Sequence, residues 1–283
     1  MNEAEYRRHG GVNFSRLKYM LDSPAHYRAE LEKAKRGEGD THSRGKLRAI
    51  HTLVLEPHLF ADDYAVWDGG RRGTNAHKAW QKTAGTRTQL TLPEFEAARD
   101  IAAAVLANPQ ASALLTDEDG AVVRFEIAGV WTDALTGLQC KGRADILRVY
   151  PTHAEVWDLK TSGSNAPRLL SAQCAKLRWH IQAAHYRDMA RSLLAKAGHP
   201  AGSVPVGGGL IVVEDNAARD VAVWELSPDT IEVGEQQRAD LLQRLKDCQA
   251  SGEWPGRFNE RQTLHLPAWA YDDSDDDDGF FTT

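Results

Sequence analysis

This chain of 283 residues has few cysteines, no long apolar run and no net positive charge. Its three cysteines, at positions 140, 174 and 248, are too few and too scattered for a disulfide framework or a four-cysteine cluster. No apolar run approaches the roughly 18 residues that suggest a membrane span, and the start, MNEAEYRRHGG, lacks the apolar core of a signal peptide. We therefore expect reduced thiols, no membrane insertion and a cytoplasmic location.

The formal net charge of −6 argues at first against binding to nucleic acid, because phosphates are neutralised by lysine and arginine. Six aspartates lie in the final stretch YDDSDDDDGFFTT, however, and removing them changes the net charge from −6 to 0. The rest of the chain is therefore neutral overall, and it can carry a basic channel if its acids bind metal or face outward. We expect this tail, residues 271–283, to be disordered, because its aspartates repel one another.

Apolar residues recur at helical spacing through the first part of the chain. They predict helices over residues 13–35, 46–55 and 93–115, with breaks at Ser23-Pro24 and Asn108-Pro109. We expect residues 37–45, GEGDTHSRG, to form the loop before the second helix. This pattern predicts a helical N-terminal part over roughly residues 1–118.

The middle of the chain changes to the period of β-strands. Consecutive strands favour an antiparallel meander, and the later alternation of helices and strands favours a mixed sheet. The expected order is strands 121–129, 138–150 and 153–162, helix 168–196, strands 206–214 and 219–226, and helix 228–250. We therefore predict one domain over residues 1–270, an α/β (α+β) fold with a central mixed sheet flanked by helices and a core over roughly 119–250.

Two neighbouring strands of this sheet carry the residues that suggest chemistry. Side chains alternate faces along a strand, so Asp158 and Lys160, two residues apart, point the same way. Asp145 lies on the preceding strand, and a short connection would bring it across from Asp158. Arg143, on the same strand, is expected to face away from the site.

Two carboxylates and an ammonium group in one pocket suit hydrolysis of a phosphodiester. Carboxylates can hold Mg²⁺, which polarises the phosphoryl group, and Lys160 can orient a water molecule or offset charge that develops on the phosphate. An Asp-x-Lys triplet also occurs by chance on solvated strand faces. The apolar neighbours Ala144 and Ile146 favour an inner strand for Asp145 instead.

The strings GRADIL, EVWDLKTS and IQAAHY together resemble the core signature of the PD-(D/E)xK nuclease superfamily, and in particular of its RecE-like and RecB-like members. The resemblance implies a restriction-endonuclease-like core in which Asp145, Asp158 and Lys160 are catalytic. It also implies a helix that carries Gln182, acting near the scissile phosphate, and Tyr186, contacting DNA. These two residues are one helical turn apart and share a face, which an ordinary packed amphipathic helix would also show.

The likeness extends to the N-terminal part of the chain. The string NFSRLKYMLDSPAHY, with Ser15 expected at DNA, resembles the opening of RecE-like domains, and RGKLRAIHTLVLEP matches the family's metal-binding histidine at His51. Glu126 occupies the place of the acid on the first core strand. The implied metal ligands are His51, Asp145 and Asp158, with Mn²⁺ as possible as Mg²⁺ because imidazole is a nitrogen ligand. A single helical histidine is more often a packing residue, so that alternative stays open.

Arg178, next to Trp179, is a further candidate for contact with the DNA backbone. In the alternative, the tryptophan packs in the core and the arginine lies at its edge. Three cysteines disfavour the iron-sulfur branch of these nucleases, and the chain has no GxxxxGK[ST] phosphate loop.

The predicted function is exonuclease digestion of double-stranded DNA ends, 5′ to 3′, for phage-type recombination. The alternatives are a RecB-like endonuclease or structure-specific nuclease, and a non-catalytic module that binds DNA ends.

The resemblance also implies partners. We expect double-stranded DNA ends, a ring-shaped homo-oligomer, and a single-strand annealing or single-strand-binding protein. The tail resembles the acidic, phenylalanine-tipped tails of bacterial single-strand-binding proteins through Gly279, Phe280 and Phe281. It could dock on a partner, compete with DNA for the enzyme's own channel, or only keep the chain soluble.

Overall fold

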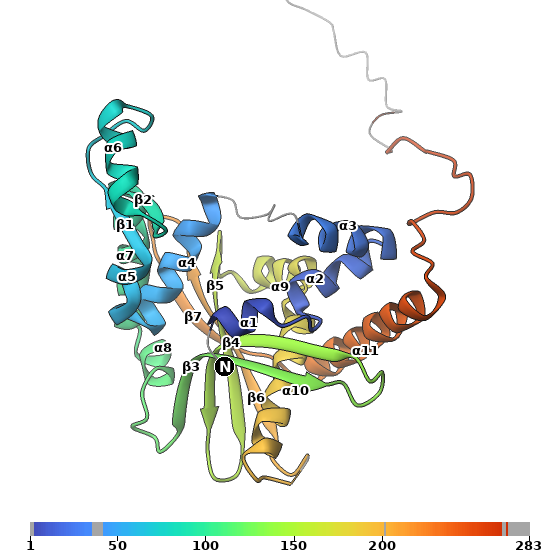
Figure 1. Cartoon of the computed structure of the whole chain (residues 1–283). Helices are drawn as coiled ribbons and strands as arrows, with labels where there is room; N and C mark the ends of the chain where they lie inside the picture. The colour runs from blue at the N-terminus through green and yellow to red at the C-terminus, as the bar shows by residue number, and fades with distance from the viewer. Residues whose placement is uncertain (1–2, 36–41, 201, 268–269, 271–283) are drawn as a thin grey trace, which may run out of the picture.

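The computed structural model describes residues 3–35, 42–200, 202–267 and 270, whose elements are coloured along the chain in Figure 1. At its centre is a five-stranded sheet in the order β3-β4-β5-β6-β7. These strands are β3 (Val122–Thr132), β4 (Gln139–Val149), β5 (Ala154–Ser162), β6 (Val206–Glu214) and β7 (Val221–Glu225). The tail, residues 271–283, lies outside the described residues.

The sheet is mixed, as the sequence predicts. β3, β4 and β5 form the expected antiparallel meander, β6 runs parallel to β5, and β7 is antiparallel to β6. The parallel step needs a crossover connection, and two helices between β5 and β6 supply it. The predicted α/β class with a central mixed sheet flanked by helices is therefore confirmed.

Helices cover both faces of the sheet because alternate strand residues point to opposite sides. On one face, Leu147 and Val156 pack with α10 (Trp179–Lys196) and α11 (Pro228–Ser251). On the other face, Ile146 and Trp157 pack with α4 (His42–Leu55), α7 (Leu92–Ala107) and α8 (Pro109–Leu114). The predicted catalytic residues of β4 and β5 lie between these two helical layers.

α10 packs on the sheet at two paired glycines, where there is no room for a side chain in the present packing. Gly129 of β3 is opposite Gly142 of β4, and an added Cβ at Gly129 would come within 2.6 Å of the Met189 side chain. An added Cβ at Gly142 would lie 3.2 Å from the ring of Tyr186. This close approach sets the height of α10 above the strands that carry the predicted catalytic residues.

The helix predicted over 168–196 is two helices. α9 (Pro167–Leu177) ends at Arg178, which has the left-handed backbone conformation (φ 64°), and α10 begins at the next residue. The prediction was wrong because a left-handed residue other than glycine leaves no signal in apolar spacing. The break redirects the chain so that Trp179 is buried.

The N-terminal part is not purely helical, which corrects the prediction of a helical part over roughly residues 1–118. β1 (Tyr64–Trp67) and β2 (Thr88–Thr91) pair in parallel and are joined by α6 (Asn75–Ala84). α4 begins at His42 and not at residue 46, and residues 37–41 of the predicted loop lie outside the described residues. The break at Asn108 is confirmed, since its side chain accepts hydrogen bonds from the backbone of Gln110 and Ala111 at the start of α8.

Short helices complete the N-terminal part. The remaining elements are α1 (Glu3–Arg8), α2 (Phe14–Leu17), η1 (Lys18–Leu21), α3 (Pro24–Lys35), η2 (Pro57–Leu59) and α5 (Phe60–Asp63). The segment after α11 returns to α3, where Trp254 stacks on Tyr27. In the described part of the chain, no helix is long and apolar enough to cross a membrane.

Candidate active site

The site is built where β4 and β5 separate. Their ladder ends at the pair Ile146 and Trp157, immediately before Asp145 and Asp158. The Asp145 carboxylate replaces the next ladder bond, because its Oδ2 accepts the backbone N–H of Leu159 at 2.8 Å. Both acids are buried, with exposed fractions of 8% for Asp145 and 6% for Asp158.

Asp158 and Lys160 share a face of β5, as strand alternation predicts, and they form an ion pair. Lys160 Nζ also donates to Gln182 Oε1 at 2.9 Å and lies 5.7 Å from the centre of the Trp179 ring. The lysine ammonium is thus held by a carboxylate, an amide and an aromatic face. Its position is set before any substrate binds, which is the condition for efficient electrostatic catalysis.

Gln182 connects α10 to this pair. While its oxygen accepts from Lys160, its Nε2 donates to Tyr186 Oη at 3.0 Å and lies 3.5 Å from Asp158 Oδ1. Burial and the nearby Asp158 carboxylate raise the pKa of Tyr186 well above its ordinary range, so this side chain is a neutral phenol. The predicted sharing of one helix face by Gln182 and Tyr186 is observed, with Asp158 and Lys160 beneath them.

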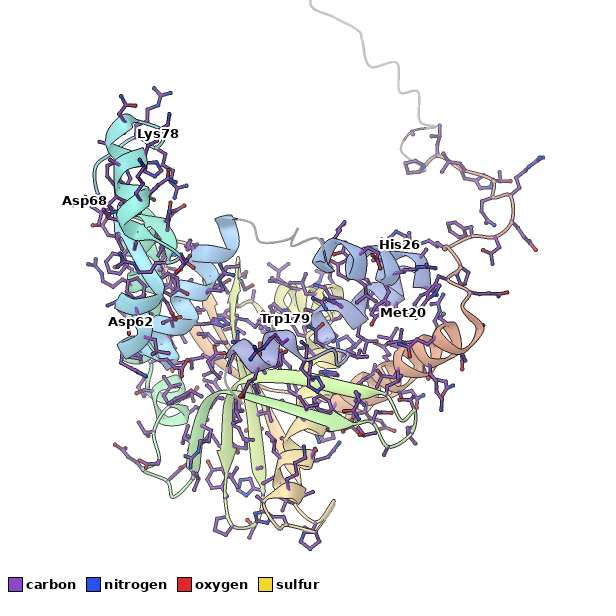
Figure 2. All side chains as sticks on the ribbon, in the orientation of Figure 1. Met20, His26, Asp62, Asp68, Lys78 and Trp179 are labelled. Carbon is purple, nitrogen blue, oxygen red and sulfur yellow. The ribbon has the colours of Figure 1, made fainter. Side chains whose placement is uncertain are left out.

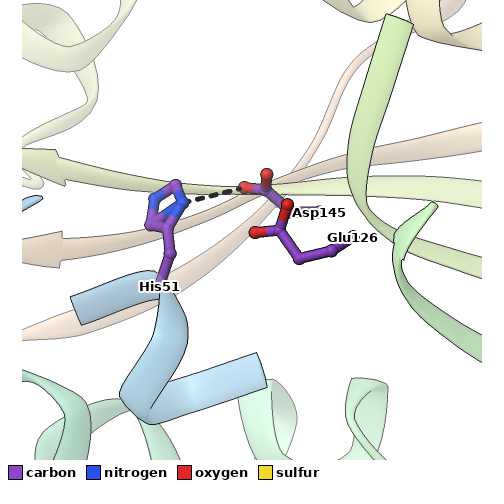
Figure 3. Close-up of side chains that lie close together, drawn as sticks. All are labelled: His51, Glu126 and Asp145. Atoms are coloured by element: carbon purple, nitrogen blue, oxygen red, sulfur yellow. Dashed lines mark ion pairs between the residues drawn. The ribbon is translucent and has the colours of Figure 1, made fainter. Parts of the chain in front are cut away.

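Two further side chains, those of His51 and Glu126, converge on Asp145, as Figure 3 shows. One ligand atom from each of these residues lies within 4.8 Å of the other two. His51 extends from α4 and places its Nδ1 3.8 Å from Asp145 Oδ2. Residues from α4, β3 and β4, far apart in sequence, therefore meet at one point.

Glu126 reaches this point through an unusual backbone. It lies between the ladder pairs Phe125–Ile146 and Ile127–Ala144, and its φ is +47°, a left-handed value that is rare for residues other than glycine. Such strain persists where surrounding structure fixes it, and it clusters at functional sites.

The prediction that Arg143 faces away from the site was wrong. Residues 143 and 145 are two apart on β4, so they share a face of the strand. Arg143 Nε pairs with Glu126 Oε2 at 2.8 Å. The arginine therefore balances part of the negative charge that gathers around Asp145.

Burial decides the protonation of the site. It lowers the pKa of His51, with the Asp145 carboxylate acting in the opposite direction, so the imidazole is neutral and can offer a lone pair. Burial and the neighbouring Asp145 raise the pKa of Asp158, against the effect of Lys160. The carboxylates of Asp145 and Asp158 thus repel each other, and a cation beside them relieves that repulsion.

The residues fit a divalent cation. An imidazole nitrogen and two carboxylates form a mixed donor set suited to Mn²⁺, and the carboxylates with water also suit Mg²⁺. The structure brings His51 and Asp145 together as predicted and adds Glu126, whereas the Asp158 carboxylate pairs with Lys160. Ligation by Asp158 stays a prediction.

Arg178 and Ser15 lie apart from this centre. Arg178 is half-buried at the α9–α10 junction, and Ser15 is exposed on α2. In the part of the chain that the structure describes, neither side chain forms a hydrogen bond or ion pair with the residues of the site. Their predicted contacts with DNA stay predictions.

The sequence as a whole matches one protein family. Residues 13–266 match the model of the PDDEXK-like domain of unknown function, DUF3799. The chain belongs to this family. It is thereby a member of the PD-(D/E)xK superfamily, which confirms the predicted superfamily but leaves the RecE-like branch a prediction.

The fold is also shared with a solved structure. A crystal structure of a candidate exonuclease from Eubacterium rectale is similar over 97% of this chain and 98% of that one, with a TM-score of 0.60 and 10% sequence identity. The structure of SSO0001 covers 75% of this chain and 89% of its own, with 16% identity and a TM-score of only 0.31. No curated protein matches the chain. At 10% identity, the first likeness concerns the fold alone.

Proposed function

We propose that this PDDEXK-like protein is a divalent-metal-dependent nuclease that digests double-stranded DNA from its ends. The observation that carries the proposal is the cluster of His51, Glu126 and Asp145 directly beside the Asp158–Lys160 pair. The name of the similar Eubacterium rectale protein agrees with exonuclease activity. The family fold alone would also serve a module that only binds DNA, but such a module does not need a lysine aimed into an acidic cluster.

Each residue has a role that follows from its position. His51, Glu126 and Asp145 would hold the cation, whose chemistry is to polarise the phosphoryl group and acidify a bound water. Lys160 orients the attacking water or offsets the charge on the phosphate, and Gln182 holds Lys160 in place. Asp158 fixes the position of the ammonium group through an ion pair.

Three forms of duplex DNA test the activity. Linear, nicked circular and closed circular DNA are incubated with the protein in Mg²⁺, in Mn²⁺ and in EDTA. We expect only the linear form to be degraded, and only with a metal. Cutting of the closed circle identifies a RecB-like endonuclease, and cutting of the nicked circle opposite its nick, with the closed circle intact, identifies a structure-specific nuclease. Binding to ends without any cleavage leaves the DNA-end-binding module.

The finer parts of the proposal follow the RecE-like resemblance. We propose 5′ to 3′ polarity, a ring-shaped homo-oligomer, and transfer of the exposed strand to an annealing or single-strand-binding partner in phage-type recombination. A linear duplex labelled at its 5′ ends should release labelled mononucleotides first, whereas 3′ label should persist. Sedimentation of the full chain gives the subunit number.

A further inference from the structure

A basic arm projects from the N-terminal part of the molecule. The β1–β2 arm, residues 64–91, contains β1, α6 and β2, and it extends to the upper left of Figure 2, where Lys78 is labelled. It carries five basic residues and one acidic residue, although the whole chain has a net charge of −6. The basic residues are Arg71, Arg72, Lys78, Lys82 and Arg87. A positive local charge on a negative chain is the electrostatic footprint of a phosphate-binding surface.

A pocket of about 440 Å³ opens between this arm and α4. This size lies within the range of small-ligand sites, roughly 300–1,000 Å³. We call it the arm pocket, and it combines aromatic rings with arginines. Its lining includes Arg48, Trp67, Arg72, His77, Trp80 and Arg87.

Three rings form a rigid wall of the arm pocket. Trp67 lies 5.2 Å from His77 and 5.4 Å from Trp80, and His77 stacks on Trp80 at 5.7 Å. Trp67 Nε1 donates to the carbonyl of Gly70, and His77 Nδ1 accepts the backbone N–H of Gly73. Trp67 and His77 are buried, whereas Trp80 is half-buried. The two fixed rings therefore support Trp80 as the aromatic face that a ligand can reach.

Arg87 lies beside this wall and is held by backbone carbonyl groups. Its Nε donates to the carbonyl of Ala84 and its Nη2 to the carbonyl of Thr83, both at 3.1 Å. In the described part of the chain, no carboxylate forms an ion pair with it. Arg72, by contrast, is paired with Glu94 at 2.7 Å. Arg87 is thus a positioned cation with a full positive charge to offer to a phosphate.

The arm pocket adjoins the candidate active site through α4. Arg48 lines the pocket, and His51, which belongs to the metal cluster, follows one helical turn later. Residues three apart on a helix are neighbours on its surface, about 5–6 Å apart at Cβ. A chain of nucleotides with one phosphate at the metal cluster can therefore reach the pocket within its next few nucleotides.

We propose that the arm pocket binds one nucleotide of single-stranded DNA, with the base stacked on Trp80 and a phosphate held by Arg87. The inference rests on the proposed nuclease function, because the strand in the pocket is an extension of the strand at the metal cluster. A base inside a duplex is stacked on both faces, so stacking on Trp80 away from a duplex end requires an unpaired strand. Aromatic rings beside arginines are the usual means by which proteins hold such strands without reading their sequence.

Binding without metal tests the pocket separately from catalysis. The full chain, in EDTA, is titrated with a short fluorescein-labelled oligothymidylate and with a blunt duplex, at several salt concentrations. The variants are Trp80→Ala, Trp80→Phe and Arg87→Gln. The control is Arg99→Gln, which removes the same charge from an exposed arginine of α7 that does not line the pocket.

We expect Trp80→Ala to weaken binding of the oligothymidylate by about 5-fold to 150-fold, the range for loss of one stacked base. Trp80→Phe should keep most of the affinity, because phenylalanine also offers an aromatic face. Arg87→Gln should reduce the slope of log affinity against log salt by about 0.7, as for the loss of one phosphate contact on a single strand. Arg99→Gln should behave as the wild type does.

Several results would overturn the proposal. They are failure of the wild type to bind the oligothymidylate, affinities of Trp80→Ala and Arg87→Gln within twofold of the wild type, or losses confined to the duplex. If Trp80→Ala lowers the melting temperature, its weaker binding could reflect unfolding. The proposal is then judged by the affinity of Trp80→Phe, which should stay near that of the wild type, and by the salt slope of Arg87→Gln, which should fall. A wild type that binds the strand through Trp80 and Arg87 but cleaves no DNA with Mg²⁺ or Mn²⁺ contradicts the proposed nuclease and supports the pocket.

Discussion

The carboxylate of Asp145 accepts the backbone N–H of Leu159 at 2.8 Å, at the point where β4 and β5 separate. The Asp145 side chain thus joins the two strands by a hydrogen bond, and it also belongs to the metal cluster with His51 and Glu126. Its structural and chemical roles can be separated by substitution. Asparagine keeps an oxygen acceptor of the same shape but loses the negative charge.

We expect Asp145→Asn to lose DNA cleavage and keep a melting temperature near that of the wild type. Asp145→Ala should lose cleavage and also about 1–3 kcal/mol of unfolding free energy, because the buried N–H of Leu159 loses its partner. Denaturant unfolding and a cleavage assay on the same preparations give both quantities. Equal stability of the two variants would show that this hydrogen bond contributes nothing.

Lys160→Met should reduce the cleavage rate by about 10² to 10³ or more while the protein still binds DNA. The methionine keeps the apolar stem but removes the ammonium group that Asp158 and Gln182 hold. Asp158→Ala should behave similarly, because Lys160 then loses its anchor. Single-turnover rates and DNA affinity in EDTA separate the two effects. Lys246→Met, at an exposed position of α11, is the matched control, and cleavage by Lys160→Met at the wild-type rate would refute this assignment.

A feature of this site can be predicted from the sequence when neighbouring residues determine it. A feature that depends on contacts between distant segments cannot be predicted in this way. The common face of Asp158 and Lys160 follows from the two-residue period of a strand, and the same rule, applied correctly, would have placed Arg143 beside Asp145. The left-handed backbone at Glu126 has no such signal, since it depends on packing of distant segments. Neither does the turn at Arg178, which divided the helix predicted over 168–196.

The β1–β2 arm was missed for a different reason. Its strands are only four residues long, 64–67 and 88–91, so alternation of apolar and polar residues has too little length to register. They pair in parallel across α6, a contact that is non-local in sequence. The excess of basic residues in this stretch was readable, but the net charge of the whole chain concealed it.

His51→Gln should raise the metal concentration needed for half-maximal cleavage by at least about tenfold, because weakening even the surroundings of a metal ligand typically has that effect. If His51 were only a packing residue, the melting temperature would fall and the metal requirement would stay unchanged. His58→Gln, an exposed histidine on η2, serves as the control. Titration of both variants with Mn²⁺ and their thermal unfolding distinguish these outcomes.

Stability should decline in mild acid because of His185. This residue is fully buried, faces Lys141 O at 3.0 Å through Nε2, and accepts from Arg238 Nε through Nδ1 at 3.3 Å. Burial, reinforced by the Arg238 charge, lowers its pKa from the ordinary 6.5 to about 3. Between these two values the unfolded chain binds a proton that the folded protein does not, so acid favours unfolding.

The contribution of His185 is therefore complete above pH 6.5 and is lost as the pH falls towards 3, by up to about 1.4 kcal/mol per pH unit. Unfolding free energies of the wild type and of His185→Gln, measured from pH 7 down to the acid limit of folding, give this term as their difference in slope. Parallel curves would show that His185 is protonated equally in both states.

The acidic tail should act on DNA or on a partner and leave the chemistry unchanged. We expect its six aspartates not to pack because they are strongly polar, and they lie far along the sequence from Asp145 and Lys160. Truncation after Ala270 should change DNA affinity or partner binding at low salt, and the change should shrink as salt screens the charges. The single-turnover cleavage rate at saturating DNA should stay the same.

Two matched variants decide what the tail does. Replacement of Phe280 and Phe281 by alanine should abolish docking on a single-strand-binding or annealing partner, since docking needs the aromatic tip. Replacement of the aspartates by asparagine should relieve competition with DNA and leave the phenylalanines intact. If neither variant changes DNA affinity or partner pull-down, the tail only keeps the chain soluble, because no charge or ring on it would then have a measurable contact.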